Sequence, residues 1–357
     1  MKKVILTTGG TGGHIYPAIA VADSLREKGV ECSFVGTKHR MEKDILGKSE
    51  YRFTGLDVTP LSPKKPLSFF RMFKSILQGI LIVMREKPDA VIGFGNYISV
   101  PLILAGLLLG KKVYLQEQNA NLGFANKLFY KFAEKSFLAF EKTYDELPLR
   151  YYKRLEVTGN PLRKEVYLAD RQAEREKLKI EEDERVLLIT GGSLGAKSIN
   201  DAMLKKWSMA LENKKVRIYW ATGEKHFEEI NNKVDKYKAN DVIKPYFENM
   251  PNIMAAADLV VCRAGALTIS EIIEVAVPAI LVPYQSIKVG QYENAKILEE
   301  VGAAFVHRNS EAEIAIDRAF DLIKDPKEMA MMRVQLKIMQ KENAADRIAN
   351  DIDIWGN

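Results

Sequence analysis

Short apolar runs recur along the chain, and most of them are followed by a stretch in which apolar residues return every three or four positions. Each run is long enough for one buried β-strand, and the stretches between the runs have the spacing of helices that pack on a sheet. This alternation is typical of βαβ units, whose strands are parallel. The pattern therefore predicts an α/β protein, with strands at or beginning at Val4, Glu31–Val35, Tyr51–Val58, Pro88–Ile92, Val113–Leu115, Val186, Val216–Ala221, Leu259–Cys262 and Ala279–Val282.

The first apolar run ends in the glycine-rich segment Gly9-Gly10-Thr11-Gly12-Gly13-His14, which leads directly into a predicted helix. Glycine lets the backbone adopt positive φ and lets its N–H groups approach a ligand, and a helix N-terminus adds partial positive charge. We therefore expect an anion-binding loop. No Gly-Lys-Ser/Thr closes it, and Ile15 stands where a dinucleotide fingerprint needs a small residue, so neither a P-loop nor a nicotinamide site is expected.

The same segment occurs twice. The stretch from Val186 to Gly195 matches Val4 to Gly13 at a constant offset of 182, with Ser193 in place of Thr11 and Leu194 in place of Gly12. The repeat predicts two Rossmann-like domains with parallel sheets facing a cleft, each with a glycine loop at the end of its first strand. We expect residues 1–161 in the N-terminal domain, residues 162–340 in the C-terminal domain, and a helix in 341–357 that crosses back. The alternative is that both loops are only tight turns.

Composition narrows the class of ligand. The 357 residues are 47% hydrophobic and 28% charged, with a net charge of +6, which favours anionic partners. The basic residues are dispersed, and without an aromatic-basic motif we expect phosphorylated ligands or anionic lipid rather than nucleic acid. Cys32 and Cys262 lie in apolar runs, as buried free thiols of a reducing compartment do. The N-terminal apolar run is too short for a signal peptide, so we expect the cytoplasmic side.

A predicted helix after Pro66 carries a long apolar stripe at helical spacing, from Phe69 to Met84. We interpret most of this stripe as the face that packs on the sheet. Its beginning is a candidate for contact with an anionic membrane, because aromatic side chains there alternate with basic ones. The membrane candidates are Lys64, Lys65, Phe69, Phe70, Arg71, Phe73 and Lys74.

Polar segments follow three further predicted strands. Gly93-Phe94-Gly95-Asn96 is a second glycine turn in the first half, and Gln116-Glu117-Gln118-Asn119 follows the next strand. In the second half, the segment Arg263 to Glu271 combines a glycine turn with a helix start, where phosphate binds well and Glu271 can accept hydrogen bonds from a ribose diol. Each segment also has a purely structural interpretation, as a loop-holding or helix-starting sequence.

These motifs together resemble the MurG family, in the same order and over essentially the whole chain. The matching segments are Gly9 to His14, Glu117-Gln118-Asn119, Gly159-Asn160-Pro161-x-Arg163, Gly191-Gly192-Ser193-x-Gly195-Ala196 and Arg263-x-Gly265-Ala266-Leu267-Thr268-x-Ser270-Glu271. The family consists of bacterial N-acetylglucosaminyltransferases with two Rossmann-like domains in the GT-B arrangement. The resemblance implies UDP-N-acetylglucosamine as donor and undecaprenyl-pyrophosphoryl-N-acetylmuramoyl-pentapeptide (lipid I) as acceptor, inversion at the sugar carbon, no cofactor or catalytic metal, and a place on the cytoplasmic face of the membrane.

The resemblance also implies roles for single residues. His14 is our first choice for the general base that takes the proton of the acceptor 4-hydroxyl, with Glu117 replacing or orienting it; a role of His14 limited to holding the acceptor stays open. The acceptor pyrophosphate is expected at Gly9, Gly10, Gly93, Gly95 and Asn96. The donor is expected at Thr11, Gly12, Gly13, Asn119, Arg163, Ser193, Phe247, Ala266, Leu267, Thr268, Ile269, Ser270, Glu271 and Gln291.

The sequence departs from the family pattern at two places. Asn96 replaces a glycine, which asparagine can do because it tolerates positive φ. The segment Lys288-Val289-Gly290 before Gln291 lacks the usual acid and second amide, which weakens the prediction of donor selectivity. Two other functions fit the same architecture: a UDP-sugar 2-epimerase, and a nucleotide-sugar binder without catalytic activity.

Overall fold

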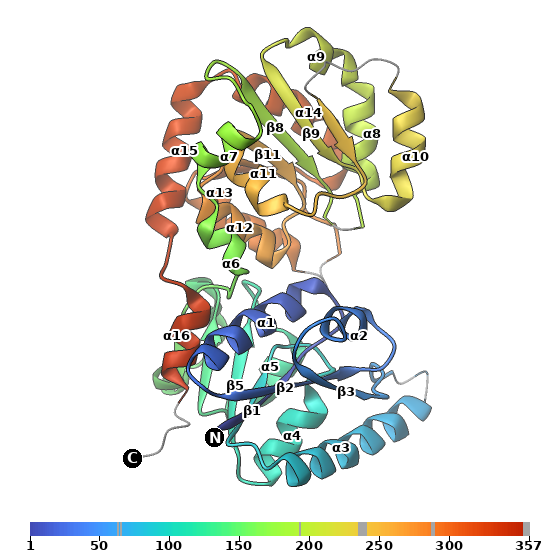
Figure 1. The fold of residues 1–357 in the computed structure, drawn as a ribbon, viewed down its shortest axis with the longest axis vertical. Coiled ribbons are helices and arrows are strands. Elements are labelled where there is room, and N and C mark those ends of the chain that lie inside the picture. The colour runs from blue at the N-terminus through green and yellow to red at the C-terminus, as the bar shows by residue number, and fades with distance from the viewer. Residues whose placement is uncertain (63, 65, 193, 235–240, 287–289, 353–357) are drawn as a thin grey trace. The chain divides into compact units, whose positions relative to one another are not determined.

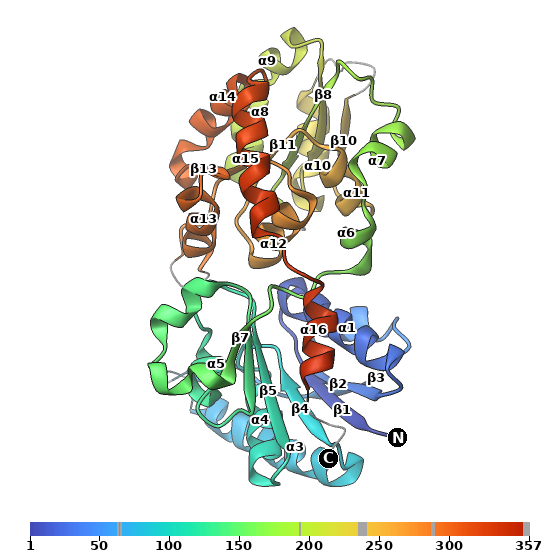
Figure 2. The same cartoon turned by 90° about the vertical axis from the view of Figure 1, so that its left-hand side faces the viewer.

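The chain forms two compact units in a computed structural model, unit 1 (Met1–Arg163 with Lys341–Asn357) and unit 2 (Lys164–Gln340). The structure describes every residue except 63, 65, 193, 235–240, 287–289 and 353–357. Each unit contains a sheet with helices on both of its faces (Figures 1 and 2). The predicted α/β class is therefore confirmed.

Unit 1 is built on a seven-stranded parallel sheet in the order β3-β2-β1-β4-β5-β6-β7. Its strands are β1 (Lys3–Thr7), β2 (Glu31–Thr37), β3 (Arg52–Leu56), β4 (Ala90–Gly93), β5 (Lys112–Glu117), β6 (Lys135–Leu138) and β7 (Leu155–Val157). Its helices are α1 (Gly12–Glu27), α2 (Met41–Leu46), α3 (Leu67–Glu86), α4 (Val100–Leu108), α5 (Phe124–Phe129) and α16 (Ala344–Asp351), with 3₁₀ turns at Glu141–Glu146 and Leu149–Arg154.

Alternate residues of the strands in unit 1 belong to different cores, because successive side chains of a strand point to opposite faces of the sheet. Ile5 packs in the core beneath α3, α4 and α5. Its neighbours Val4 and Leu6 pack in the core beneath α1 and α16. Helix α16 is attached to α1 by Ser24, whose hydroxyl donates to Asp346 at 2.8 Å. The last described helix of the chain therefore completes the core of the first unit.

Helix α3 contradicts one expectation. Its buried face consists of Ser68, Met72, Ser75, Gly79, Ile82 and Val83. A Cβ on Gly79 would lie 2.9 Å from the carbonyl oxygen of Pro101, so a glycine is needed where α3 approaches α4. The stripe that we interpreted as mostly core instead faces outward, with Phe70 65%, Leu81 65% and Met84 56% exposed. That interpretation is wrong, since the packed face combines the small residues Ser68, Ser75 and Gly79 with Met72, Ile82 and Val83, and most of the stripe lies outside it.

Within the described residues, α3 is also the helix with the length and apolar composition to cross a membrane. A third of its most apolar stretch, 33%, is nevertheless buried inside unit 1. We therefore describe it as a helix that packs on the unit with one face and exposes the other.

Unit 2 is built on a six-stranded parallel sheet in the order β10-β9-β8-β11-β12-β13. Its strands are β8 (Arg185–Thr190), β9 (Val216–Ala221), β10 (Val242–Lys244), β11 (Leu259–Cys262), β12 (Ala279–Leu281) and β13 (Ala304–Val306). Its helices are α6 (Lys164–Leu168), α7 (Arg171–Lys177), α8 (Lys197–Lys205), α9 (Trp207–Glu212), α10 (Glu224–Lys233), α11 (Met250–Ala256), α12 (Ala266–Val275), α13 (Gln291–Glu300), α14 (Ala312–Leu322) and α15 (Pro326–Met339).

The strand order places the glycine loops at equivalent points of the two sheets. Strand β1 lies between β2 and β4, and strand β8 lies between β9 and β11. The chain therefore leaves β1 and β4, and likewise β8 and β11, in opposite directions. In parallel α/β sheets ligands bind at such switch points, outside the carboxyl ends of the strands. Each unit presents two of the predicted motifs at its switch point.

Candidate functional site

The loop after β1 needs glycine for both conformation and space. Gly9 and Gly10 have φ of 156° and 93°. A Cβ on Gly9 would lie 2.5 Å from the Glu42 carboxylate, and one on Gly10 would lie 2.7 Å from the amide of Asn96. The Glu42 carboxylate also accepts the Gly10 N–H at 3.0 Å, which holds the loop in place. Thr11 is exposed at its tip, and α1 begins at Gly12 and Gly13.

The loop after β4 is tied to this first loop by Asn96. Its side-chain amide donates to the Gly9 carbonyl at 2.7 Å, while its φ of 65° lies in the left-handed region. The backbone tolerance expected of asparagine here is therefore real. Gly93 has another reason to be glycine, because it lies inside β4 and a Cβ there would stand 2.5 Å from Ile103. Gly95 has φ of 71° and turns the chain toward α4.

His14 lies in the first turn of α1, and its ring is partly buried. Nδ1 lies 2.8 Å from Oε1 of Gln118. The Gln118 amide nitrogen already donates to Gln116, so Oε1 is the atom that faces the ring and Nδ1 carries the proton. Burial lowers the pKa of His14, although the charge of Glu117, the Gln118 bond and the Phe94 backbone act to raise it. The ring is therefore neutral near pH 7, with its lone pair on Nε2.

The Glu117 carboxylate, only 2% exposed, is occupied by four hydrogen bonds. It accepts the main-chain N–H of Asn119 at 3.0 Å and of Gly123 at 2.7 Å. It also accepts the side-chain amides of Asn119 at 3.2 Å and Asn126 at 2.8 Å. Such a carboxylate orders the loop from 117 to 126, and it has no free oxygen lone pair aimed at a substrate proton.

The start of this loop is also held by a network of side-chain hydrogen bonds that the sequence did not reveal. The Gln116 amide donates to Asn160 at 3.1 Å, and the Asn160 amide donates to the Gln118 carbonyl at 3.0 Å. Asn160 comes from the segment after β7, so the network joins two strand ends with His14. Three residues later, the Arg163 guanidinium stands 5.1 Å from the ring centre of Tyr16. The sequence indicated such a network only through the run of amide side chains in Gln116-Glu117-Gln118-Asn119. The hydrogen-bond partners of these amides could be identified only from the fold.

In unit 2 the loop after β8 also needs its glycines. Gly192 and Gly195 have φ of 80° and 74°. A Cβ on Gly195 would lie 2.2 Å from the carbonyl of Thr222, and one on Gly223 would lie 2.6 Å from Gly195. Two glycines therefore face each other where the loops after β8 and β9 touch. Ser193, a predicted donor contact, lies outside the described residues.

The second loop of unit 2 leads from β11 into α12. Gly265 precedes the helix in an extended conformation, with φ of −63°, and the helix begins at Ala266. Leu267, Thr268 and Glu271 are partly exposed, whereas the side chains of Ile269 and Ser270 are buried. The last two are therefore placed to offer main-chain rather than side-chain groups.

Arg263 joins several segments at the carboxyl edge of the unit 2 sheet, a role that the sequence did not assign. Its guanidinium donates to the Val282 carbonyl at 2.7 Å, to Asn309 at 2.7 Å and to Ser198 at 3.2 Å. It thereby joins the ends of β11 and β12 to α8. Gln291 begins α13, and its side-chain oxygen accepts the N–H of Tyr284 at 2.8 Å.

Phe247 differs from the other predicted donor contacts. Its side chain is 3% exposed and packs against Tyr219, with ring centres 5.9 Å apart. A ligand can therefore reach only its main chain in this structure. Within the described residues, no group of three or more histidine, cysteine or acidic side chains is arranged to hold a metal ion.

Two family profiles match the chain. The glycosyltransferase family 28 N-terminal domain matches residues 4–138, and the glycosyltransferase family 28 C-terminal domain matches residues 186–352. The chain is 54% identical over 357 residues to the UDP-N-acetylglucosamine–N-acetylmuramyl-(pentapeptide) pyrophosphoryl-undecaprenol N-acetylglucosamine transferase of Fusobacterium nucleatum, covering 100% of this chain and 99% of that one. It is 34% identical to the enzyme of the same name from Halothermothrix orenii, covering 98% of both.

Solved structures of similar fold match nearly the whole chain. Acinetobacter baumannii MurG superimposes with a TM-score of 0.78 at 29% identity, covering 98% of both chains. A putative UDP-N-acetylglucosamine 2-epimerase from Listeria monocytogenes superimposes with a TM-score of 0.72 at 16% identity, covering 98% of this chain and 95% of that one. At that identity the second likeness concerns the fold alone.

Proposed function

The chain belongs to the MurG family of glycosyltransferases, and from that premise we propose how its residues divide the work of the reaction. The enzyme transfers N-acetylglucosamine from UDP-N-acetylglucosamine to lipid I, which gives lipid II in peptidoglycan synthesis. Its fold is GT-B-like, with two parallel-sheet α/β domains. The chemistry requires a base for the acceptor hydroxyl, countercharge or N–H donors for the UDP leaving group, and a holder for the lipid-linked acceptor.

We assign the nucleotide of the donor to unit 2. Backbone N–H groups of the loop from Gly191 to Gly195 and of the α12 start face the diphosphate, where a helix N-terminus favours negative charge. Glu271, one turn into α12, accepts hydrogen bonds from the ribose hydroxyls. The remaining proposed contacts of this unit are Ser193, the main chain of Phe247, Ala266, Leu267, Thr268, Ile269, Ser270 and Gln291.

Five residues of unit 1 complete the proposed donor contacts: Thr11, Gly12, Gly13, Asn119 and Arg163. Asn119 is held by Glu117 through both its main chain and its side chain, so its amide is preorganised. A preorganised donor loses little further freedom when it binds, which makes each of its hydrogen bonds more effective.

His14 is proposed to be the general base. Its Nε2 lone pair accepts the proton of the acceptor 4-hydroxyl while that oxygen forms a bond to C1 of N-acetylglucosamine. The bond from C1 to the UDP oxygen breaks, and the electron pair leaves with UDP, so the sugar carbon is inverted. General-base catalysis of this kind contributes roughly 10²–10⁴-fold in rate. Glu117 acts as a positioning residue, because its carboxylate already accepts hydrogen bonds from Asn119, Gly123 and Asn126 in the loop that follows it.

The acceptor pyrophosphate is proposed to lie on the two loops of unit 1, at Gly9, Gly10, Gly95 and Asn96. Gly93 supports this site from within β4, where its missing side chain leaves room for Ile103. The hydrogen bond from Asn96 to the Gly9 carbonyl keeps the two loops in one arrangement.

We further propose that α3 places the enzyme on an anionic membrane surface at the cytoplasmic face. The support is its outward face, on which Phe69, Phe70 and Phe73 are 52%, 65% and 58% exposed. Lys64, Arg71 and Lys74 beside them are exposed too, while Lys65 lies outside the described residues. Aromatic side chains that enter the interface together with cations that meet lipid phosphates are the usual composition of such a surface.

The observation that carries these assignments is the pair of glycine loops at equivalent switch points of the two sheets. The test is a transfer assay with labelled UDP-N-acetylglucosamine and lipid I, in which the label is expected in a lipid-extractable disaccharide product. The same donor without lipid I is the control. Epimerised sugar or free UDP at high turnover in that control would instead support a 2-epimerase, and donor binding with no transfer would support a simple binder.

A further inference from the structure

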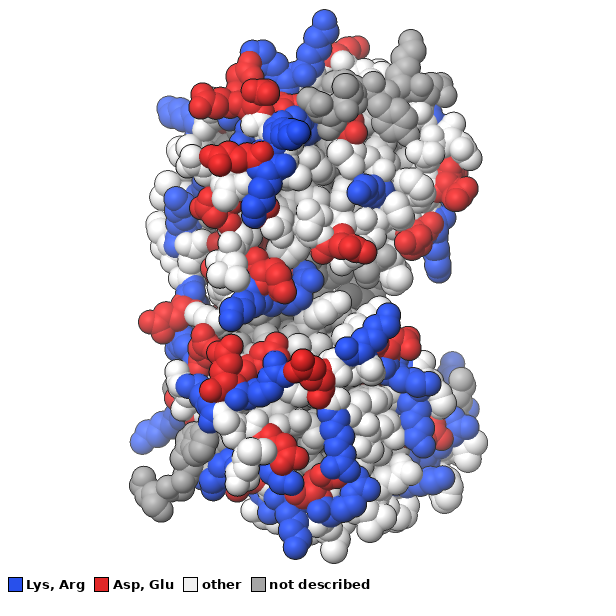
Figure 3. Space-filling model, viewed as in Figure 1, with Lys and Arg blue, Asp and Glu red and all other residues white. Residues whose placement is uncertain are grey.

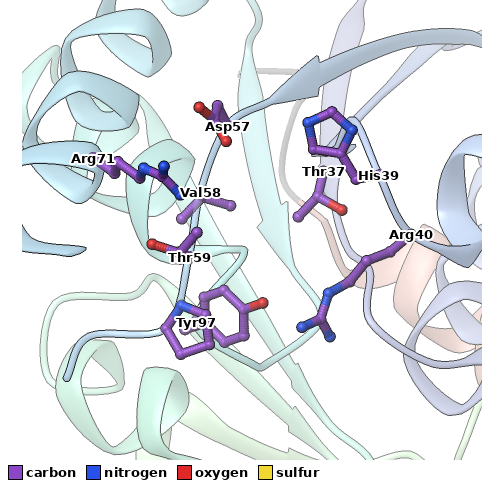
Figure 4. Close-up of a pocket in the computed structure, with 9 residues that line it drawn as sticks. Thr37, His39, Arg40, Asp57, Val58, Thr59, Arg71 and Tyr97 are labelled. Carbon is purple, nitrogen blue, oxygen red and sulfur yellow. The ribbon is translucent and has the colours of Figure 1, made fainter. Parts of the chain in front are cut away.

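Unit 1 contains a cavity that the proposed mechanism does not use. It has a volume of about 370 Å³ and lies beyond the carboxyl ends of β2 and β3, beside α3 (Figure 4). Its lining residues come from four separate segments: Thr37, His39 and Arg40; Asp57, Val58, Thr59 and Pro60; Arg71; and Tyr97.

The chemistry of this cavity favours an anion. Arg40 and Arg71 reach it from opposite sides, and Thr59 adds a hydroxyl group, whereas the Thr37 hydroxyl already donates to the Glu42 carboxylate (Figure 4). The Arg40 guanidinium stands 5.8 Å from the ring centre of Tyr97. Within the described part of the chain, neither guanidinium has a hydrogen bond or an ion pair with another residue. Unpaired guanidinium groups in a cavity are suited to phosphate, which they bind through two N–H groups at once.

Two carboxylates affect the net charge of the first cavity. Asp57 is the acid among the lining residues, so the cavity carries one net positive charge when His39 is neutral. Glu42 stands behind the wall, and it is occupied by the N–H groups of Thr37 and Gly10 at 2.9 and 3.0 Å. On the face shown in Figure 3, several basic side chains lie on the part of unit 1 that contains α2 and β3. The local charge therefore attracts anions.

A second, more apolar cavity continues from the first. Its volume is about 610 Å³, and it shares Thr59, Pro60 and Arg71 with the first cavity. Its other lining residues are Ser62, Pro66, Leu67 and Ser68, and the Ser68 hydroxyl is already bonded to the main chain of Ser62. Leu67 is 59% exposed and begins the outward face of α3. The first cavity thus adjoins a more apolar cavity that borders the outward face of α3 at Leu67.

The other end of the first cavity adjoins the acceptor loop. Arg40 Nη1 lies 3.9 Å from the position that a Cβ on Gly10 would take. The loops at residues 9–13 and 93–96 contain no lysine or arginine, although a diphosphate diester carries a negative charge on each phosphate. The countercharge must therefore come from neighbouring segments.

From these contacts we propose that the two cavities bind the polyprenyl diphosphate part of the acceptor. Arg40 and Arg71 supply the positive charge for the diphosphate that lies on the loops of unit 1, and the second cavity, along Pro60, Pro66 and Leu67, takes the first isoprenoid units. This subsite selects a lipid-linked diphosphate over a free sugar phosphate, because only an amphiphile fills both cavities. The assignment rests on the proposed function, since it concerns the same acceptor.

The kinetic test uses the full-length enzyme and a water-soluble, short-chain version of lipid I. Arg40→Gln and Arg71→Gln are each expected to raise the acceptor KM about tenfold, the usual effect of losing a charge-assisted hydrogen bond, and to leave the donor KM unchanged. Arg85→Gln is the matched control, because Arg85 lies on the same helix, is exposed, and pairs with Glu86 outside both cavities. An acceptor KM that is unchanged in both variants would overturn the proposal.

A binding test separates this subsite from the transferase reaction, since it needs no turnover. Calorimetry would compare farnesyl diphosphate, farnesol and inorganic pyrophosphate on the wild type and on Arg40→Gln/Arg71→Gln. We expect farnesyl diphosphate to bind more tightly than either fragment, and the double variant to lose at least tenfold of that affinity. If pyrophosphate binds as well as farnesyl diphosphate, or if the variant binds unchanged, the subsite is not one for a lipid-linked diphosphate. A protein that shows this binding but transfers no sugar would refute the proposed function alone.

Discussion

His14 and Gln118 are separated by 104 positions in the chain, yet Nδ1 of the histidine lies 2.8 Å from the side-chain oxygen of the glutamine. This bond fixes the tautomer of the ring, because Nδ1 must carry the proton that Gln118 accepts. It thereby leaves Nε2 as the basic atom. Gln118 is itself held by Gln116 and Asn160, so the orientation of the proposed base depends on three amides from two strand ends.

The first prediction concerns pH. Because burial lowers the pKa of His14, the acid limb of kcat against pH should lie below pH 6.5, the ordinary value for histidine. The Gln118 bond acts to raise this pKa, so Gln118→Met should move the acid limb to still lower pH. The same variant should lower the plateau of kcat, since the ring loses its fixed orientation. An acid limb that does not move in Gln118→Met would show that another group titrates.

The second prediction separates two roles of Glu117. Gln in its place keeps one oxygen but turns an NH₂ group toward one of the N–H donors that the carboxylate now accepts, Gly123 among them. Leaving such a donor unpaired costs about 1–3 kcal/mol, so Glu117→Gln should lower the free energy of unfolding by that amount. Thermal melts measure the loss, and kinetics should show a raised KM for the donor, because Glu117 holds the proposed donor contact Asn119. A variant with unchanged stability and abolished kcat would instead identify Glu117 as the base.

The third prediction concerns the glycine pair of unit 2. Gly195→Ala adds a Cβ 2.2 Å from the Thr222 carbonyl and should disrupt the donor loop, so that UDP affinity falls at least about tenfold. Gly302→Ala is the control, because Gly302 has a similar φ of 69° but open space around it. The control variant should lose only about 1 kcal/mol of stability, the cost of a positive φ at a residue with a side chain. Equal UDP affinities in the two variants would mean that the Gly195 loop does not bind the diphosphate.

The fourth prediction concerns α3. Replacing Phe69, Phe70 and Phe73 with serine should reduce binding to anionic vesicles and leave activity on a water-soluble acceptor intact, because these rings face outward. The matched control replaces three exposed apolar residues of unit 2, Leu168, Ile314 and Met331, which are 71%, 56% and 56% exposed. Vesicle sedimentation would measure the difference. Equal retention of both triple variants on vesicles would remove the membrane assignment.

The sequence predicted those features that depend on one short segment. The strands and glycine loops could be predicted because a run of apolar residues followed by Gly9 and Gly10, or by Gly191 and Gly192, has few structural alternatives. Asn96 could be predicted to accept a left-handed backbone for the same local reason. The short strands β6, β7, β10 and β13 were not predicted, since three or four residues carry too little periodicity.

Features that depend on partners far along the chain could not be predicted. Helix α3 carries apolar residues on both its buried and its exposed face, so the spacing of these residues did not show which face packs on unit 1. The structure places Gly79 against α4, where close approach matters more than hydropathy, and buries Ser75, whose hydroxyl donates to the Asp57 carbonyl. Glu117 had the composition of a catalytic acid, but its four hydrogen-bond partners turned it into a loop-holding residue. The cavity between Arg40 and Arg71 joins segments that share no sequence motif.

The most direct test of the account is the effect of His14→Ala on the steady-state kcat with UDP-N-acetylglucosamine and lipid I. A general base that is removed should lower kcat by about 10²-fold or more, while the dissociation constant of the donor, measured separately, should change little. Retention of kcat within a few-fold of the wild type, or a matching loss of donor affinity, would contradict the assignment of His14 as the base.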